Sequence, residues 1–595
     1  SDVYKRQLSN VSLDDIYTAE SGRVFMPGTQ ALVRLPLEQR RRDVAAGLNT
    51  AGFISGYRGS PLGGYDQQLH RARKHLEEHH ILFRPGLNED LAATAVWGSQ
   101  QSGLYGDAKY DGVFGIWYGK GPGVDRSGDA FKHANQNGTL QHGGVLAFAG
   151  DDHMAKSSTI AHQSEYAFVD AFIPVLSPAG VQEFLDLGLH GFAMSRFSGL
   201  WTGFICVGET VDSAATVLVD PDRVKPVIPA DFDMPPEGLN SKLVVAEFLM
   251  LEELLHKYKI PAALAYARAN RLDKVVWSSP QRRMGIVTTG KSYLDVRQAL
   301  DDLGIDEETA AKIGLSVYKV AMPWPLETEG AKAFAQGLET LLVVEEKRSL
   351  MEWQLKDALY SLPADRRPEV LGKLGRNGEP QFPSNGELSP ASVARVIARL
   401  LDNDAVDSTI RARIGERISR IEAVTSMTGG NAPPSMVRTP YFCSGCPHNT
   451  STKVPEGSRA GAGIGCHYMA MWMDRSTAGF THMGAEGANW TGQAPFVETP
   501  HLFQNLGDGT YYHSGLLAIR AAVSAGTNIT YKILYNDAVA MTGGQTHDGP
   551  LDPMQIAHQV WAEGVKKVVV VADEKEDIPE NATWPPGTNM YERAE

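Results

Sequence analysis

Two kinds of apolar pattern alternate along this chain. One kind is a short, nearly uninterrupted apolar run, which is typical of parallel strands buried on both faces of a sheet. The other is a longer stretch with apolar residues at helical spacing, as in residues 37–47 and 514–525. The alternation predicts an α/β protein built on parallel sheets. The apolar runs lie at residues 145–149, 286–287, 341–344 and 568–571.

The predicted elements fall into three blocks, at residues 12–222, 283–402 and 439–595. The segment 426–437, Ser-Met-Thr-Gly-Gly-Asn-Ala-Pro-Pro-Ser-Met-Val, has the glycine and proline punctuation of a linker. A chain of 595 residues suits three or four domains at roughly 150 residues each.

Composition narrows the class of protein. The chain is 43% hydrophobic and 21% charged, as in ordinary globular proteins, and its formal net charge is −14. That charge argues against nonspecific binding to nucleic acid or to an anionic membrane. No apolar run approaches the 18 residues of a membrane span, and the first residues lack the blocks of a signal peptide. We therefore expect a cytoplasmic protein.

The third block contains a candidate magnesium site. Gly507-Asp508-Gly509 follows a predicted strand, and Asn536 comes 28 residues after Asp508, at the end of the next strand. Oxygens of the Asp508 and Asn536 side chains and of the Ala538 carbonyl suit Mg²⁺, and a diphosphate would add more. Glycines on both sides let the backbone approach phosphates. The tripeptide alone would be an ordinary turn, but the spacing and the flanking strands favour the site.

Around this site the chain resembles the thiamine diphosphate enzymes that oxidise 2-oxo acids. Thr510–Gly515 and Ala540–Gln545 look specifically like the indolepyruvate ferredoxin oxidoreductase family, in its fused bacterial form, and the resemblance extends from about residue 12 onward. It implies doubly wound parallel sheets in two cofactor domains, a pyrimidine-binding domain at 12–222 and a diphosphate- and Mg²⁺-binding domain at 439–595. It also implies a transketolase C-terminal-like domain at 283–402. The last domain looks incomplete, so we expect a chain truncated at its C-terminus.

The resemblance also implies roles for single residues. Contacts to thiamine diphosphate are expected from Gly507, Asp508, Gly509, Thr510, Asn536 and Met541. Thiamine chemistry needs a carboxyl group of the protein that is hydrogen-bonded to the pyrimidine ring of the cofactor. An Asn-Glu pair opens a helix in this family with glycine nine residues on, and Asn88-Glu89 with Gly98 fits. Without the resemblance, Glu89 would be a carboxylate at the start of a helix; with it, Glu89 is the expected catalytic acid.

A glycine-rich turn at residues 55–64 follows a predicted strand, and such turns bind anions. The family places a Thr/Ser-Pro here near the substrate, which implies substrate binding by Ser60. Arg58 stands where relatives commonly have proline, and we assign it to the substrate carboxylate. Ordinary turn chemistry is an equal alternative for both residues.

Three of the four cysteines are clustered. Cys443 and Cys446 form a Cys-x-x-Cys pair, and Cys466 follows. The residues alone suit either an iron–sulfur cluster or zinc, which His448 or His467 could complete. The resemblance favours a [4Fe–4S] cluster, with a fourth ligand that is not in this chain. Cys206 is expected to be a core thiol.

Two further motifs are rejected. Gly285–Ser292 satisfies the Walker A expression, but its Ile-Val-Thr-Thr is β-forming and predicts a strand. Gly461–Gly465 is only faintly like a dinucleotide turn, because no strand is predicted before it. Residues 1–7 match nothing in the family and are excluded from the fold prediction.

The resemblance implies a reaction. A 2-oxo acid, expected to be indolepyruvate or another aryl pyruvate, would react with coenzyme A and oxidised ferredoxin to give acyl-CoA, CO₂ and reduced ferredoxin. A homodimer is expected, since thiamine sites often form across dimers. Two alternatives stay open: a non-redox thiamine-dependent decarboxylase or synthase with structural zinc, and a non-catalytic thiamine-fold scaffold subunit.

Overall fold

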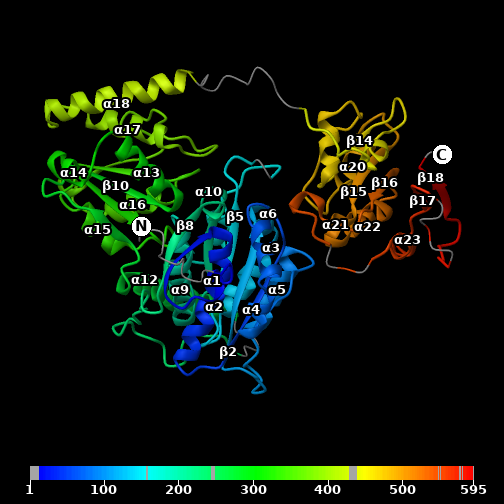
Figure 1. Cartoon of the computed structure of the whole chain (residues 1–595), viewed down its shortest axis with the longest axis horizontal. Coiled ribbons are helices and arrows are strands. Elements are labelled where there is room, and N and C mark those ends of the chain that lie inside the picture. The colour runs from blue at the N-terminus through cyan, green and yellow to red at the C-terminus, as the bar shows by residue number, and fades with distance from the viewer. Residues whose placement is uncertain are drawn as a thin grey trace, which may run out of the picture. The chain divides into compact units, whose positions relative to one another are not determined.

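A computed structural model describes the chain as two compact units, Ser1–Ala432 and Pro433–Glu595. In Figure 1 the first unit runs from blue to yellow-green and the second from yellow to red. Most of the predicted linker, residues 428–437, lies outside the described residues, as do residues 1–7. The described residues are 12–155, 158–242, 248–427, 439–546, 549, 551–574, 578 and 581–593.

The first unit is built around a six-stranded parallel sheet with the order β3-β2-β4-β5-β7-β6. The chain passes from β2 to β3 at one edge and then returns to the other side of β2 as β4. This reversal makes the crevice between β2 and β4 a topological switch point, where α/β proteins bind ligands. The strands are β2 Thr50–Gly56, β3 Ile81–Phe83, β4 Gly112–Lys120, β5 Val145–Asp151, β6 Val175–Leu176 and β7 Thr202–Val207.

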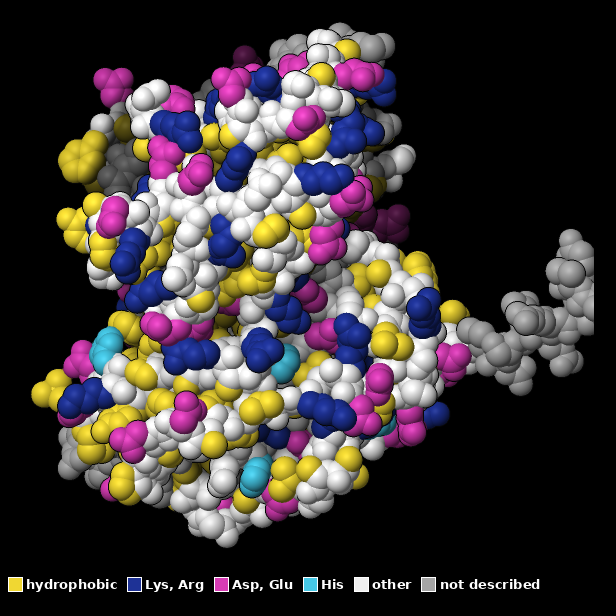
Figure 2. Space-filling model, turned by 90° about the vertical axis from the view of Figure 1, so that its left-hand side faces the viewer, with side chains coloured by type: hydrophobic (Ala, Val, Ile, Leu, Met, Phe, Trp, Pro, Cys, Tyr) yellow, Lys and Arg dark blue, Asp and Glu magenta, His cyan; other side chains and the backbone are white. Residues whose placement is uncertain are grey.

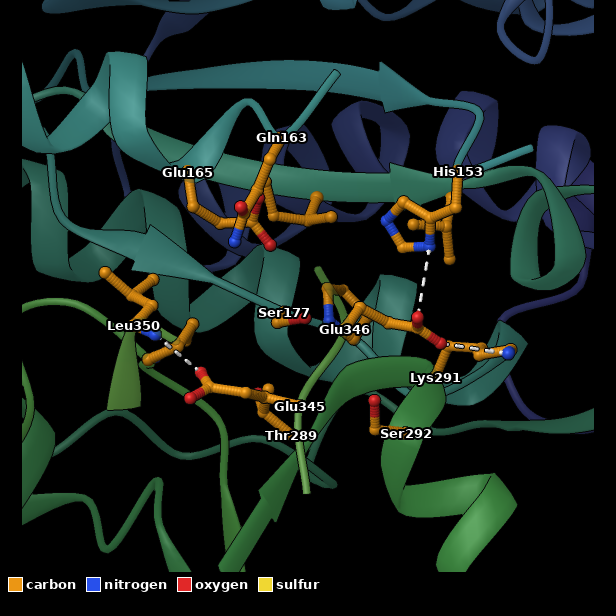
Figure 3. Close-up of a pocket in the computed structure, with 14 residues that line it drawn as sticks. His153, Gln163, Glu165, Ser177, Thr289, Lys291, Ser292, Glu345, Glu346 and Leu350 are labelled. Carbon is orange, nitrogen blue, oxygen red and sulfur yellow. Dashed lines mark hydrogen bonds and ion pairs between the residues drawn. The ribbon is translucent and has the colours of Figure 1, made fainter. Parts of the chain in front are cut away.

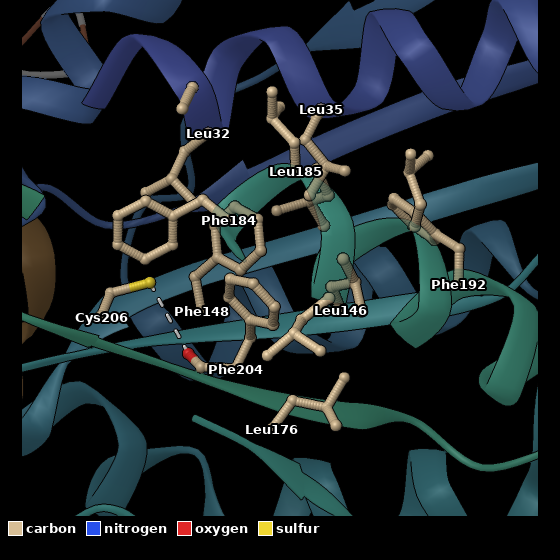
Figure 4. Packing of buried hydrophobic residues seen from close by; sticks show 14 of the residues in the cluster. Leu32, Leu35, Leu146, Phe148, Leu176, Phe184, Leu185, Phe192, Phe204 and Cys206 are labelled. Carbon is tan, nitrogen blue, oxygen red and sulfur yellow. Dashed lines mark hydrogen bonds between the residues drawn. The ribbon is translucent and has the colours of Figure 1, made fainter. Parts of the chain in front are cut away.

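Helices cover both faces of this sheet. Leu146 and Phe148 of β5 pack with α2 (Gly28–Ala45) and α9 (Val181–Ser198), as Figure 4 shows for part of that cluster. Val145 and Ala147 point the other way, into a cluster with α5 (Glu89–Ser99) and α7 (Gly128–Asn137). Burial on both faces explains why β5 is apolar from Val145 to Ala149.

Cys206 lies in the first of these clusters, where it is fully buried and its Sγ is 3.7 Å from the carbonyl oxygen of Phe204. The prediction of a core thiol is confirmed. The remaining elements of this part are α1 Asp15–Thr18, β1 Gly22–Pro27, α3 Gly63–Arg71, α4 Arg73–Glu78, α6 Gly121–Arg126, α8 Glu165–Asp170, α10 Gly208–Val211, β8 Ala214–Val219, α11 Phe248–Leu254, η1 Leu255–Lys259 and α12 Ile260–Ala269.

A second sheet in the same unit has the order β13-β12-β10-β11-β9. All its pairs are parallel except β11 with the edge strand β9, which the sequence did not predict. The segment that satisfies the Walker A expression forms β10 and the first residues of α13, so its rejection as a phosphate loop is confirmed. The elements are β9 Lys274–Trp277, β10 Met284–Thr289, α13 Gly290–Asp302, α14 Glu307–Ile313, β11 Leu315–Val320, α15 Thr328–Ala335, β12 Thr340–Val344, α16 Met351–Tyr360, β13 Glu369–Leu371, α17 Pro390–Leu401 and α18 Ser408–Met427.

The second unit has a parallel sheet of β14 (Ala460–Gly461), β15 (Leu502–Gly507) and β16 (Ile529–Leu534). A strand therefore does precede the Gly461–Gly465 run, and the expectation that none would was wrong, because a two-residue strand has no sequence pattern of its own. The helical elements are α19 His448–Ser451, η3 Cys466–Trp472, α20 Ala488–Gln493, α21 Asp508–Thr510, η5 Tyr511–Gly515, α22 Leu516–Ser524, η6 Ala540–Thr542 and α23 Pro553–Ala562.

The apolar run at 568–571 behaves differently from the others. It forms β17 (Val569–Ala572), which pairs in the described residues with β18 (Asn589–Glu592) alone. Val569 and Val571 are 44% and 60% exposed, so the prediction of burial on both faces is wrong for this strand. A two-stranded sheet offers too little surface for covering layers on both sides.

These sheets confirm the predicted α/β class with parallel sheets, whereas the three domain boundaries stay predictions. Within the described residues no helix is both long and apolar enough to cross a membrane. Figure 2 shows one face of the molecule, where acidic and basic side chains are interspersed and the described residues form no continuous basic patch.

The aromatic centre of the first core gives a stability prediction. Phe148 is fully buried, with ring centroids of Phe204 and Tyr65 at 5.4 and 5.7 Å. We expect Phe148→Ala to lower the free energy of unfolding of this unit by about 3–5 kcal/mol, measured by denaturant titration. Tyr105→Ala, at a side chain that is 76% exposed, should change it by less than about 0.5 kcal/mol. Equal effects would contradict this core.

Candidate functional site

Glu89 is the first residue of α5 and is 7% exposed. Asn88 caps the helix, its Oδ1 accepting a hydrogen bond from the Leu91 amide at 3.0 Å. The Trp117 indole on β4 donates to the Glu89 carbonyl oxygen at 2.9 Å, which fixes the start of the helix against the sheet. The structure thus places this carboxyl group, in a mostly buried position, beside the first sheet.

The backbone of α6 lies directly against the Glu89 side chain. A Cβ atom on Gly123 would be 2.5 Å from Cγ and 2.9 Å from Oε1 of Glu89, so only glycine fits here without displacing the carboxyl group. Lys120 ends β4 nearby. Burial lowers the pKa of Lys120, and the opposing charges of Asp152 and Glu89 raise it, so the Lys120 and Glu89 side chains lie within electrostatic range of each other.

The glycine-rich turn that follows β2 adjoins Lys120. A Cβ on Gly59 would be 2.6 Å from Cδ of Lys120. Arg58 is 3% exposed with its guanidinium 5.7 Å from the Tyr57 ring, whereas Ser60 is exposed. Arg58, Lys120 and Glu89 thus gather at the carboxyl edge of β2 and β4, at the switch point of the sheet. Their roles stay predictions.

In the second unit, Asp508 joins the ends of two adjacent parallel strands. Its Oδ1 accepts the Gly509 amide at 2.7 Å, and its Oδ2 accepts the amides of Asn536 and Asp537 at 2.9 and 2.7 Å. Asp508 is 4% exposed. The turn after β16 passes through Asp537 at φ 52°, in the left-handed region that aspartate adopts more readily than most residues.

The other predicted contacts lie around this carboxylate. Oδ1 of Asn536 accepts the Ala538 amide at 3.2 Å, and the Thr510 hydroxyl donates to the Ile464 carbonyl oxygen at 3.0 Å. Gly507 immediately precedes Asp508 at the end of β15, and Met541 is 64% exposed in η6. The carboxylate, amide and carbonyl oxygens are of the hard type that Mg²⁺ takes together with phosphate oxygens, so the residues fit the predicted group.

The predicted cysteine ligands lie within electrostatic range of one another. Burial raises the pKa of the Cys466 thiol, and nearby Cys446 and Cys443 raise it further. Sγ of Cys446 lies 3.2 Å from Nδ1 of His448. In the described part of the chain, no three or more His, Cys, Asp or Glu side chains are arranged so that they could hold a metal ion. The iron–sulfur ligand set therefore stays a prediction.

Sequence reasoning named His448 and His467 only as alternative zinc ligands and did not single out Glu486, which also lies against the glycine run at 461–465. His467 is 1% exposed, and burial lowers the pKa of its imidazole to about 3, with His448 and Lys532 adding to the shift. The rings of His448 and His467 are parallel, with centroids 6.0 Å apart. Burial also raises the pKa of Glu486 to about 7, although the amides of Ile464 and Gly484 donate to it. In the sequence this region was marked by Gly-x-Gly-x-Gly and by the candidate metal ligands beside it, and nothing there indicated the burial of Glu486.

Two segments of the chain match known families. Residues 274–427 match the indolepyruvate oxidoreductase domain. Residues 463–580, which include the Asp508 and Asn536 turns, match the C-terminal TPP binding domain of thiamine pyrophosphate enzymes. The first of these matches names the indolepyruvate oxidoreductase family, to which the chain is similar. The family resemblance and the thiamine diphosphate fold predicted from the sequence are thereby confirmed.

Indolepyruvate oxidoreductase subunits align along most of the chain. Indolepyruvate oxidoreductase subunit IorA of Methanothermobacter marburgensis is 26% identical over 558 residues, covering 91% of this chain and 80% of the relative. The same subunit from Archaeoglobus fulgidus is 25% identical over 551 residues, covering 90% and 78%. Among solved structures, 2-oxoglutarate:ferredoxin oxidoreductase from Magnetococcus marinus is 15% identical with a TM-score of 0.47, covering 64% of this chain and 66% of that one.

Within the first unit, a cavity of about 30 Å³ lies between the two sheets. Figure 3 shows Glu345 and Glu346, which follow β12, facing Glu165 and His153 of the other sheet domain. Lys291 is 3.0 Å from Glu346. Burial raises the pKa of Glu165 to about 8, with Asp151 adding to the shift, and raises that of Glu345 to about 7. The acidic groups were not predicted, because they come together only through tertiary packing.

This cavity predicts a pH dependence of stability. A folded-state pKa of about 8 exceeds the ordinary value of 4.5 for Glu165, so its contribution is complete below about pH 4.5 and is lost as pH rises through 8. We expect Glu165→Gln, which is neutral throughout, to reduce the fall in unfolding free energy between pH 5.5 and 8.5 by about 1 kcal/mol or more. The measurement is denaturant titration at both pH values.

The matched control for this prediction is Glu78→Gln, at a side chain that is 55% exposed. It should keep the pH dependence of the unsubstituted protein. A Glu165→Gln protein with that same dependence would show that Glu165 is ionised in the folded state.

Proposed function

We propose that this chain catalyses the oxidative decarboxylation of a 2-oxo acid, an aryl pyruvate such as indolepyruvate, with coenzyme A and ferredoxin as the other reactants. The observation that carries the proposal is the position of Asp508, whose carboxylate three backbone amides hold at the carboxyl end of β15. It lies in the segment that matches the TPP binding domain. The relatives' name, indolepyruvate oxidoreductase, supports the substrate class.

Bound thiamine diphosphate supplies an acidic thiazolium C–H and an electron sink for decarboxylation. In the proposal, Asp508, Asn536 and the Ala538 carbonyl bind Mg²⁺, and Gly507 and Gly509 allow the backbone close to the diphosphate. Thr510 and Met541 are further contacts. The amides that hold Asp508 leave a lone pair for a metal ion on Oδ1, which accepts one hydrogen bond, whereas Oδ2 accepts two.

Glu89 is the proposed catalytic acid, which exchanges a proton with the pyrimidine ring. Its support is positional: the side chain is 7% exposed, and Gly123 closes against it. A buried carboxyl group makes a stronger hydrogen bond than one in water. Arg58 and Ser60, on the turn after β2, are proposed to bind the substrate carboxylate.

Electron transfer is assigned to a [4Fe–4S] cluster on Cys443, Cys446 and Cys466. This assignment is supported by a short series of contacts that leads from Cys446 to Gly507, beside the proposed diphosphate site. Cys446 lies 3.2 Å from His448, whose ring is stacked with that of His467, and His467 lies beside Gly507. A cluster here would accept electrons close to where decarboxylation releases them and pass them to ferredoxin. A homodimer is part of the same proposal.

The direct test is an anaerobic assay that follows the reduction of a viologen dye or of ferredoxin in the presence of coenzyme A, thiamine diphosphate and Mg²⁺. We expect 2-oxo-acid-dependent reduction, faster with indolepyruvate or phenylpyruvate than with pyruvate. Release of CO₂ without reduction of the acceptor would instead identify a non-redox decarboxylase. Failure to bind thiamine diphosphate in a titration would identify a scaffold subunit.

Mutations can separate the proposed proton transfer by Glu89 from the proposed cofactor binding by Asp508. We expect Glu89→Gln to bind thiamine diphosphate within about threefold of the unsubstituted affinity but to turn over about 10²–10⁴-fold more slowly, because it loses proton transfer. Asp508→Ala should weaken Mg²⁺-dependent cofactor binding at least about tenfold. The control is Glu77→Gln, at an exposed side chain. Unchanged turnover in Glu89→Gln would remove the acid assignment.

Metal analysis tests the cysteine assignment. Anaerobically purified protein should contain iron and acid-labile sulfide, and Cys446→Ser should lower both, because a thiolate ligand is lost. Substitution of the buried core thiol, Cys206→Ala, should leave the iron content unchanged. Zinc without sulfide would contradict the redox proposal and favour a thiamine-dependent decarboxylase or synthase.

A further inference from the structure

Two buried polar side chains in the second unit lack hydrogen-bond partners among the described residues. His467, 1% exposed, has no partner at Nδ1 or Nε2, and Asn505, fully buried on β15, has none at Oδ1 or Nδ2. Buried polar groups are nearly always hydrogen-bonded in folded proteins, by the protein itself, by water or by a ligand. These four atoms therefore call for a polar occupant beside them.

The edge of the His467 ring that carries Nε2 lies among glycines. Its Cε1 is 2.7 Å from the position a Cβ would take on Gly463, and its Nε2 is 2.8 and 3.3 Å from those positions on Gly465 and Gly507. Gly465 has φ +150°. Side chains at these positions would fill the space in front of the ring, so the glycines keep that edge accessible.

This glycine-lined edge is at the carboxyl end of two neighbouring parallel strands. Gly463 and Gly465 follow β14, Gly507 ends β15, and the Thr510 hydroxyl ties the two loops together through the Ile464 carbonyl oxygen at 3.0 Å. Gly507 directly precedes Asp508, the proposed Mg²⁺ ligand. The crevice outside the carboxyl ends of parallel strands is where α/β proteins take up ligands.

We propose that His467 is a cofactor-binding residue, whose Nε2–H donates a hydrogen bond to the diphosphate of bound thiamine diphosphate. This inference rests on the proposed function, since it needs that cofactor in the second unit. A neutral imidazole carries one N–H and one acceptor nitrogen, and diphosphate oxygens accept only. The stacked ring of His448 lies over the face of His467 and leaves the Nε2 edge for the ligand.

The test uses the full chain and three substitutions. His467→Phe keeps a flat ring of similar size against His448 but cannot donate, and we expect it to weaken binding of thiamine diphosphate with Mg²⁺ about tenfold or more. His467→Gln can place an N–H near Nε2 and should recover affinity to within about threefold. His501→Ala is the matched control, because His501 bonds to Thr530 before β15 begins.

Affinities are measured by calorimetry or by tryptophan fluorescence, with inorganic diphosphate and Mg²⁺ as a second ligand. If the His467 ring contacts the diphosphate, His467→Phe should weaken the binding of thiamine diphosphate and of inorganic diphosphate equally. Iron and acid-labile sulfide are counted in the same samples, because His467 is adjacent to Cys466. Circular dichroism and the thermal midpoint of unfolding show whether each variant is folded. If His467→Phe is unfolded, His467→Asn replaces it. The same loss of affinity is expected, because the asparagine amide is too short to reach the position of Nε2.

The outcomes separate the inference from the proposed function. Weaker binding of both ligands at unchanged iron content supports the inference. Unchanged affinity overturns it, as does loss of iron with unchanged affinity, which would assign the ring to the cysteine loops. If the unsubstituted protein binds no thiamine diphosphate, the proposed function itself has failed.

Discussion

Three backbone amides converge on the carboxylate of Asp508, one from its own turn and two from the turn after β16. Hydrogen bonds to a charged group contribute about 1.5–3 kcal/mol each. Because Asn536 and Asp537 are exposed, this carboxylate is what ties their turn to β15. The spacing between Asp508 and Asn536 is therefore a structural requirement as well as a chemical one: the intervening helix must return the chain to the neighbouring parallel strand.

The same design recurs in the first unit. There, too, the side chains with proposed roles lie near the carboxyl ends of parallel strands, and glycine occupies the positions where the backbone approaches them. Gly123 lies against Glu89 as Gly463 and Gly507 lie against His467. In both units the sheet supplies rigidity and the glycines supply room, so the chemistry depends on residues without side chains as much as on those with them.

The sequence predicted those features that depend on residues close together in the chain. Continuous apolar runs predicted β5, β10 and β12, and the strand-turn pattern predicted the Asp508 site. It failed where tertiary packing decides. The edge strand β9 is half-exposed and short, so it carries little pattern. The His467 crevice and the acidic cavity consist of residues that are far apart in the sequence or marked only by glycine, and burial of such groups has no periodicity to detect.

The contrast between Cys206 and the other three cysteines has a practical meaning. Cys206 is sealed inside the first core, whereas Cys443 is exposed and Cys446 and Cys466 are partly so. A thiol reagent applied to the folded protein therefore meets only the cysteines proposed to hold the cluster. Counting reactive thiols before and after unfolding would thus gauge cofactor loading, and oxidative damage in air would begin at the electron-handling loops while leaving the scaffold intact.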